Sequence, residues 1–150
     1  MLRALVLISA TLLCVSALAC EPGQREVFSC TLDNGKQIQV CQAPDRLTYV
    51  YGTPAKTDLA LSQPNDTARE LSESSASGVN NSFFFANGED RYIVEHMVDP
   101  IDGRLYDAFL ISFKTGVQSS ENNSCKEGTV RFNKKAITAK PNEANTLSRD

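Results

Sequence analysis

Residues 27–40 read V-F-S-C-T-L-D-N-G-K-Q-I-Q-V, and this stretch decides the fold class. Two short runs of strand-forming residues flank Asn34 and Gly35, a pair that readily takes the positive φ angles of a tight hairpin turn. In the second run apolar and polar residues alternate, which is typical of a strand with one face in water. We therefore expect residues 27–32 and 37–40 to pair as an antiparallel hairpin.

The register of this hairpin depends on the length of its turn. A two-residue turn would place Cys30 opposite Gln39 and Cys41 opposite Phe28. The two cysteines would then not face each other, which argues against a disulfide bond between them.

Similar strand signals recur along the chain. Further runs of strand formers bounded by turn residues lie at 47–51, 58–62, 83–85, 91–98 and 105–113, and weaker ones lie between 117 and 132. We find no convincing amphipathic helix. The pattern predicts an all-β fold, a small antiparallel β-barrel or sandwich of about seven or eight strands.

Three other segments are expected to lack strands. Residues 65–81 are rich in Ser, Asn, Asp and Glu, and we expect a solvated loop that is long for a compact domain. Residues 52–57 are expected to form the loop of a second hairpin. The chain turns polar again at Asn133, so residues 133–150 are expected to form a frayed tail. Residues 20–132 then make up a single β domain.

The first 19 residues have the pattern of a cleavable signal peptide. A basic start at Arg3 precedes an apolar run over residues 4–17, and Ala17-Leu18-Ala19 is a small-x-small cleavage site. The run is shorter than the roughly 20 residues that cross a bilayer. We expect an exported protein, periplasmic or secreted, without a transmembrane segment.

The cysteines agree with export. Cys14 would leave with the leader, and the remaining four form an even set that predicts two disulfides in one of three pairings. Cys20 follows the cleavage site directly, where a bacterial lipoprotein carries its lipid. A lipid anchor at Cys20 is therefore the alternative to ordinary secretion.

Composition and motifs exclude several functions. The formal net charge of −3 argues against nucleic-acid binding, which needs a basic face. No Cys-x-x-Cys pair occurs and His96 is the only histidine, so we expect neither a metal nor another cofactor.

The sequence contains no convincing catalytic motif. No serine lies in a Gly-x-Ser-x-Gly elbow, and a lone histidine such as His96 usually has a structural role. The carboxylates of Glu89, Asp90, Glu95 and Asp99 could pair for acid–base chemistry, but spacing alone identifies no such pair. A calcium site formed by Asp99, Asp102 and Asp107 is equally unsupported. The segment around these three aspartates lacks the regular ligands of a calcium loop.

Several short motifs occur in the order seen in a known family. They are V-F-S-C, L-T-Y-V-Y-G, D-L-A-L-S-Q, S-A-S-G, F-F-F-A-N-G and N-S-C-K. From about residue 27 to residue 126 the chain resembles bacterial membrane-bound or periplasmic inhibitors of c-type lysozyme, and it also resembles uncharacterised exported bacterial proteins. The resemblance implies a small exported β-barrel with a Cys30–Cys125 disulfide, which leaves Cys20–Cys41 as the second.

In the inhibitor family a Ser-Gly-x-x-Tyr loop and a later Lys-Gly turn enter the lysozyme cleft. Here Ser77 and Gly78 match the first motif, with Asn81 in place of the tyrosine, and Asn87 replaces the lysine of the second. A charge-assisted hydrogen bond of roughly 1.5–3 kcal/mol is thereby missing. The partner-binding residues implied by the resemblance are Ser75, Ser77, Gly78, Asn81, Asn87 and Gly88.

These observations lead to one main hypothesis and two rivals. The main one is a non-enzymatic exported binding protein, similar to lysozyme inhibitors, that occludes an enzyme cleft with residues 75–81 and the turn at 86–89. The first rival is an envelope-associated or secreted structural or interaction domain that does not act on a lysozyme. The second is a secreted hydrolase that uses His96 with a nearby acid.

Overall fold

The computed structural model describes residues 18–74, 78–99, 101, 105–114, 117–119 and 123–139. These residues form ten β-strands and one short 3-10 helix. The strands are β1 (Arg25–Thr31), β2 (Gln37–Gln42), β3 (Arg46–Thr53), β4 (Lys56–Pro64), β5 (Arg69–Ser74), β6 (Gly78–Asn87), β7 (Asp90–Val98), β8 (Leu105–Lys114), β9 (Val117–Ser119) and β10 (Arg131–Phe132), and the helix is η1 (Lys134–Ala136).

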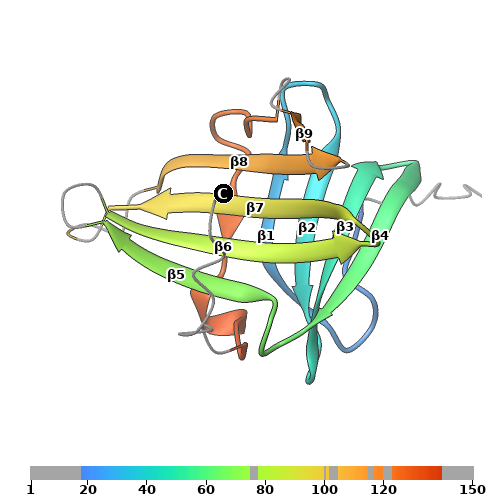
Figure 1. Cartoon of the computed structure of the whole chain (residues 1–150), viewed down its shortest axis with the longest axis horizontal. Coiled ribbons are helices and arrows are strands. Elements are labelled where there is room, and N and C mark those ends of the chain that lie inside the picture. The colour runs from blue at the N-terminus through green and yellow to red at the C-terminus, as the bar shows by residue number, and fades with distance from the viewer. Residues whose placement is uncertain are drawn as a thin grey trace, which may run out of the picture.

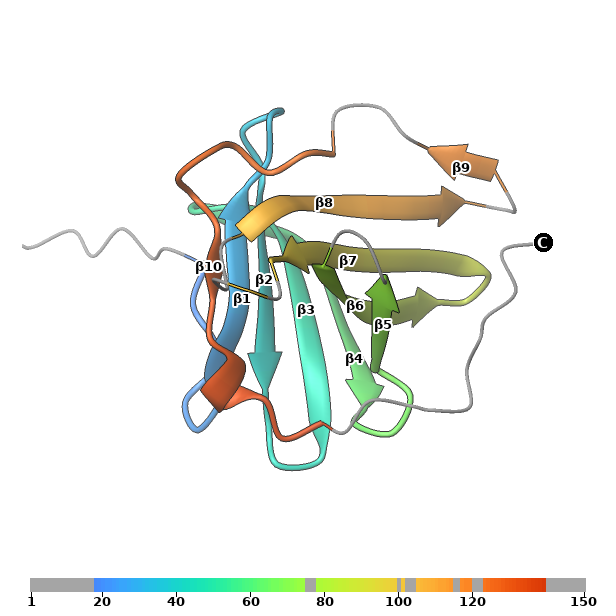
Figure 2. The ribbon, with the colours of Figure 1, turned by 90° about the vertical axis from the view of Figure 1, so that its left-hand side faces the viewer.

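The strands form two sheets of five. The first has the order β10-β1-β2-β3-β4 and the second the order β5-β6-β7-β8-β9, and every neighbouring pair is antiparallel. Figures 1 and 2 show that the strands of the second sheet run across those of the first. The predicted all-β class is confirmed, and within the described residues the sheets do not close into a barrel.

The core lies between the inner faces of the two sheets. Alternate residues of each strand point inward, so the large buried side chains come from both sheets. Tyr49 of β3 contacts Phe85 of β6, with ring centroids 5.3 Å apart. Full burial of one such side chain stabilises the fold by about 1.5–3 kcal/mol. The largest members of this core are Phe28, Leu32, Ile38, Leu47, Tyr49, Phe83 and Phe85.

The first hairpin forms as predicted, but its predicted register is wrong by one residue. Cys30 lies opposite Ile38, not Gln39. The amide of Gly35 donates to the carbonyl of Leu32 at 2.9 Å, and the φ angle of Gly35 is 81°. The loop therefore has three residues, with glycine in the left-handed region that such loops require. Cys30 and Cys41 are still not opposite each other.

The long loop predicted at residues 65–81 is also wrong. Most of it is β5 and the start of β6, paired from Arg69↔Phe83 to Ser74↔Gly78. Its polar residues obscured a strand whose pairing is set by its neighbour, because β-propensity depends strongly on context. Similarly, the loop predicted at 52–57 is a two-residue turn at Pro54 and Ala55.

The frayed tail predicted at residues 133–150 is wrong for residues 133–139. Ala136 and Ala139 are 2% and 3% exposed, so this segment packs on the core through Ala136, Ile137 and Ala139. Residues 140–150 lie outside the described part of the chain. The folded domain therefore extends beyond residue 132, the boundary that we expected.

Two disulfides pin the structure, and they are the pairs that the resemblance implies. Cys20 is bonded to Cys41 and Cys30 to Cys125, with Cα–Cα distances of 5.7 and 5.8 Å. Two disulfides indicate an oxidising environment, such as that outside the cytoplasm. In the part of the chain that the structure describes, no helix has the length and hydropathy of a membrane span.

Candidate binding surfaces

The two predicted contact regions lie at opposite ends of one strand. Gly78 begins β6 and Asn87 ends it. Nine residue steps along a strand span about 30 Å, and Figure 1 shows the two ends on opposite sides of the sheet. Ser75 and Ser77 lie outside the described residues. A single narrow cleft therefore cannot receive both ends of β6 as a pair of adjacent loops.

Asn81 is not available to a partner. It lies within β6 opposite His96, and only 5% of it is exposed. The expectation that Asn81 stands in a contact loop is therefore wrong. The cause is the strand that replaces the predicted loop, because that strand places residue 81 on the inner face of the sheet.

The turn between β6 and β7 is an exposed, well-supported hairpin end. Asn87 pairs with Asp90, so only Gly88 and Glu89 lie between the strands. Nη1 of Arg91 donates to the carbonyls of Gly88 and Asp90 at 2.7 and 3.0 Å. A turn held in this way loses little conformational entropy on binding. Asn87 and Gly88 are both exposed, as a contact site requires.

His96 lies in the core among aromatic rings. Its ring centroid is 3.9 Å from that of Phe132, 5.5 Å from that of Phe28 and 6.1 Å from that of Phe83. None of its surface is exposed. A substrate in solution therefore has no direct access to this imidazole.

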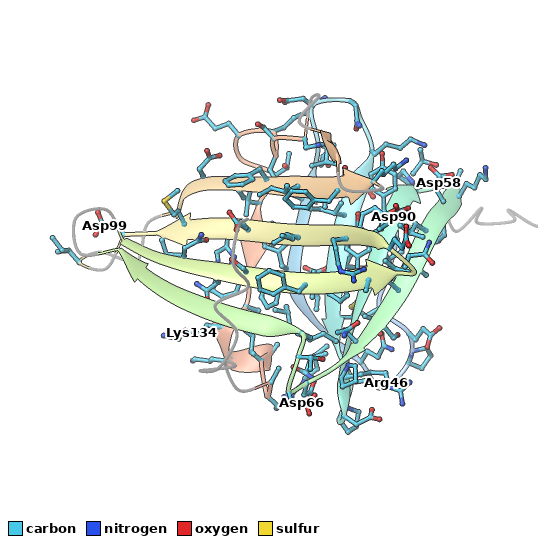
Figure 3. All side chains as sticks on the ribbon, in the orientation of Figure 1. Arg46, Asp58, Asp66, Asp90, Asp99 and Lys134 are labelled. Atoms are coloured by element: carbon cyan, nitrogen blue, oxygen red, sulfur yellow. A yellow bond between two sulfur atoms is a disulfide. The ribbon has the colours of Figure 1, made fainter. Side chains whose placement is uncertain are left out.

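The carboxylates singled out in the sequence are spread over the molecule. Figure 3 shows Asp90 and Asp99 at opposite ends of β7, too far apart for a shared reaction. Oδ1 of Asp99 accepts the amide of Ile101 at 2.7 Å, a local turn contact. Asp102 lies outside the described residues, and within them no three of His, Cys, Asp and Glu could hold a metal ion together.

The outer face of the second sheet is apolar at its centre. Phe84, Ile93 and Ile111 are direct neighbours across β6, β7 and β8, and all three are half-buried. The adjacent rows are Ser82, Glu95 and Phe109 on one side and Ala86, Arg91 and Phe113 on the other, and Ser82 and Glu95 are buried. The neighbours of these residues along each strand fill the core instead. This apolar face reaches the β6–β7 turn, because Ala86, Arg91 and Phe113 form its last row.

The outer face of the first sheet has the opposite character. Its outward positions carry mostly Ser, Thr, Gln and Glu, with Val50 and Ala60 among them, and the hydroxyls of Thr48 and Ser62 lie 3.2 Å apart across β3 and β4. A sheet with one face in water normally shows such a polar outer side. The contrast between the two sheets marks the second one as unusual.

Charged groups gather where the first sheet turns. Lys36 and Asp58 form a salt bridge, and Nζ of Lys56 is 3.4 Å from Oδ1 of Asp58. Hydrogen bonding to Lys36 lowers the pKa of Asp58, and the same bond raises the pKa of Lys36. Burial raises the pKa of Tyr49 well above its ordinary value, so its phenol stays neutral. Since Asp58 is already paired with two lysines, this corner does not form an acid–base centre.

Sequence reasoning missed the apolar face, although a signal for it exists. A strand with one wet face alternates apolar and polar residues, whereas residues 83–85 are three phenylalanines in a row. Residues 109–111 repeat this pattern as F-L-I. Apolar residues on both faces of two strands of one sheet predict that a partner also covers the outer side of that sheet.

Comparisons with protein-family models, with curated protein sequences and with solved structures found no match.

Proposed function

We propose that this chain is an exported, non-enzymatic binding protein that contacts a protein partner through the apolar face and the adjoining β6–β7 turn. The observation that carries the proposal is the row Phe84, Ile93 and Ile111, which stands on the outside of the second sheet. Continuous apolar patches on the surface of a soluble protein commonly mark interaction sites.

The core supports a binding role for this face. The buried cluster between the sheets contains Phe83, Phe85 and Val94, which alternate with the residues of the apolar face. Because the core lies on the other side of the sheet, only a partner on the outer face can shield Phe84 and Ile93 further from water. A sheet whose inner face is packed on the core can offer this surface with little loss of entropy on docking.

Export is supported by the leader pattern and by the two disulfides. The sulfur of Cys20 is bonded to Cys41, so it is not available for the thioether bond of a lipid anchor. This favours a free exported protein over a lipoprotein. The burial of His96 among aromatic rings supports a function without catalysis.

A photo-crosslinking experiment tests the binding surface. A benzophenone side chain is placed at residue 93 on the apolar face, or at residue 60 on the polar face as a matched control. Both proteins are exposed to the extracytoplasmic fraction of the producing cells. We expect a discrete adduct at position 93 alone, which excess wild-type protein suppresses and excess Phe84→Lys does not. Equal adducts at both positions would refute the proposal.

Lysozyme inhibition is the second candidate. It is favoured by the resemblance together with the presence of the disulfides Cys20–Cys41 and Cys30–Cys125. Because the ends of β6 are about 30 Å apart, only the Asn87–Gly88 turn would enter a cleft. An acidic chain is also complementary to basic enzymes of this kind.

Titration of the mature protein against c-type, g-type and i-type lysozymes tests this candidate, with lysis of bacterial cells as the readout. Inhibition that Asn87→Asp weakens and Ala60→Asp leaves intact would support it. No inhibition at micromolar excess of the protein would remove it. That result would leave the crosslinking test of the apolar face unaffected.

A further inference from the structure

The polar outer face of the first sheet contains a hollow of about 400 Å³ beside β1 and β2. A bulge at Val27 puts Glu26 and Ser29 on this same face, although three positions separate them. Glu26 lies opposite Cys41, and Ser29 lies opposite Gln39. The hollow thus brings a carboxylate and an amide together next to a disulfide.

Glu26 and Gln39 line this hollow together with Arg131, which lies opposite Ser29. Oε1 of Glu26 accepts the hydroxyl of Ser29 at 3.1 Å, and Oε2 accepts Nε2 of Gln39 at 2.5 Å. Gln39 is only 5% exposed, and within the described part of the chain its Oε1 is buried without a hydrogen-bond partner. Glu26 forms no salt bridge with any described residue. A cationic donor would satisfy both groups.

The start of the described chain lies over this hollow. Leu18 lines it, and Leu18, Ala19 and Cys20 also line the neighbouring hollow over β3 and β4. The disulfide holds the Cα of Cys20 5.7 Å from that of Cys41. Directly opposite Cα atoms in an antiparallel pair are about 5 Å apart, so the Cα of Cys20 is within roughly 11 Å of that of Glu26.

We propose that the hollow is the binding site of the mature N-terminus. Signal peptidase adds water across the Ala19–Cys20 peptide bond, which releases a carboxylate on Ala19 and a protonated α-amine on Cys20. The cut also removes Leu18 from the hollow. The new ammonium then donates to the carboxylate of Glu26 and to Oε1 of Gln39. This inference rests on cleavage after Ala19, and it is independent of the apolar face.

Two functions follow for this site. The disulfide and the ammonium contact together fix the first residue of the mature chain on the sheet. Both groups of Cys20 that a lipoprotein modifies, the thiol and the amine, are thereby engaged in the fold. With both groups engaged, Cys20 cannot carry a lipid, and the mature protein has no lipid anchor at this residue.

A thermodynamic cycle tests the site. The protein is prepared with Cys20 as its first residue, either with a free amine or N-acetylated, each with and without Glu26→Gln. We expect acetylation to lower the folding equilibrium constant about tenfold, as loss of a charge-assisted bond does, and this effect to disappear in Glu26→Gln. The matched control Glu21→Gln should keep the full effect. Equal effects of acetylation with and without Glu26 would overturn the proposal.

A second measurement needs no variant at Glu26. The rate at which the Cys20 amine reacts with an acylating reagent is compared with that of a short peptide of the same N-terminal sequence, its cysteine blocked as a disulfide. A paired ammonium should react at least tenfold more slowly than the peptide. Equal rates would show that the amine stands free in solution and would also overturn the proposal.

Discussion

The backbone amide of Ala139 donates a hydrogen bond of 3.1 Å to Oε1 of Gln42, which lies 97 positions earlier in the chain. The amide of Thr138 donates to the same oxygen, also at 3.1 Å. On its other side, Nε2 of Gln42 donates to the carbonyls of Ala43 and Arg46. One buried side chain thus joins the β2–β3 turn to residues 138–139.

Gln42→Leu should therefore detach the C-terminal segment. The change leaves several backbone groups without partners, and each such group costs about 1–3 kcal/mol when it stays buried. We expect the variant to lose about 2–4 kcal/mol of unfolding free energy and residues 133–139 to become sensitive to protease. The control is Gln63→Leu, whose side chain bonds to Thr67 in an exposed position. Protease resistance equal to wild type would contradict the role of Gln42.

The two disulfides should contribute unequally to stability. The Cys30–Cys125 bond closes a loop of 95 residues, whereas the Cys20–Cys41 bond closes one of 21. A loop-entropy model gives about 4.7 kcal/mol for the longer loop and about 3.3 kcal/mol for the shorter. Replacing each pair by alanines and measuring urea unfolding tests this order. Equal losses of unfolding free energy would mean that the disulfides do not act mainly by restricting the unfolded chain.

Gly52 should not tolerate a side chain. A Cβ atom there would overlap the carbonyl oxygen of Lys56 and lie 2.9 Å from the amide nitrogen of Asp58. Both are backbone atoms of the tight β3–β4 turn, so neither can move freely. We expect Gly52→Ala to cost about 1–3 kcal/mol in chemical denaturation, while Thr57→Ala nearby changes little. A neutral Gly52→Ala would show that the turn can open.

The salt bridge of Asp58 should make stability depend on acid pH. Its pKa is lowered in the folded state by the hydrogen bond from Lys36. The bridge therefore stabilises the fold above the ordinary pKa of an aspartate, and this contribution is lost as the pH falls through the lowered folded value. We expect Asp58→Asn to lower Tm at pH 7 by a small, salt-sensitive amount and to approach wild type as the pH falls through the lowered pKa of Asp58. A difference that grows toward low pH would contradict this sign.

Turn chemistry made most strands predictable from the sequence, but not their exact pairing. Asn34-Gly35 signals a hairpin, yet the same pair fits a two-residue or a three-residue loop. The positive φ of Gly35 and its hydrogen bond to Leu32 select the longer loop. This choice depends on packing of both sheets, because it decides which face of β1 enters the core.

Long-range partners explain the segments that sequence reasoning missed. Residues 69–74 form a strand because β6 supplies a complete ladder, and residues 133–139 are held by the distant Gln42. Neither partner is visible in the local composition. The position of Asn81 was mispredicted for the same reason, since β6 buries Asn81 and separates Gly78 from Asn87.

Binding of an apolar dye tests the central claim most directly, namely that the apolar face is an open interaction surface. The mature protein is titrated with the neutral dye Nile red, beside Ile93→Lys on the apolar face and Ala60→Lys on the polar one. We predict that wild type and Ala60→Lys raise the dye fluorescence equally and that Ile93→Lys largely abolishes the rise. No rise with folded wild-type protein, or an undiminished rise with Ile93→Lys, would contradict the proposed binding surface.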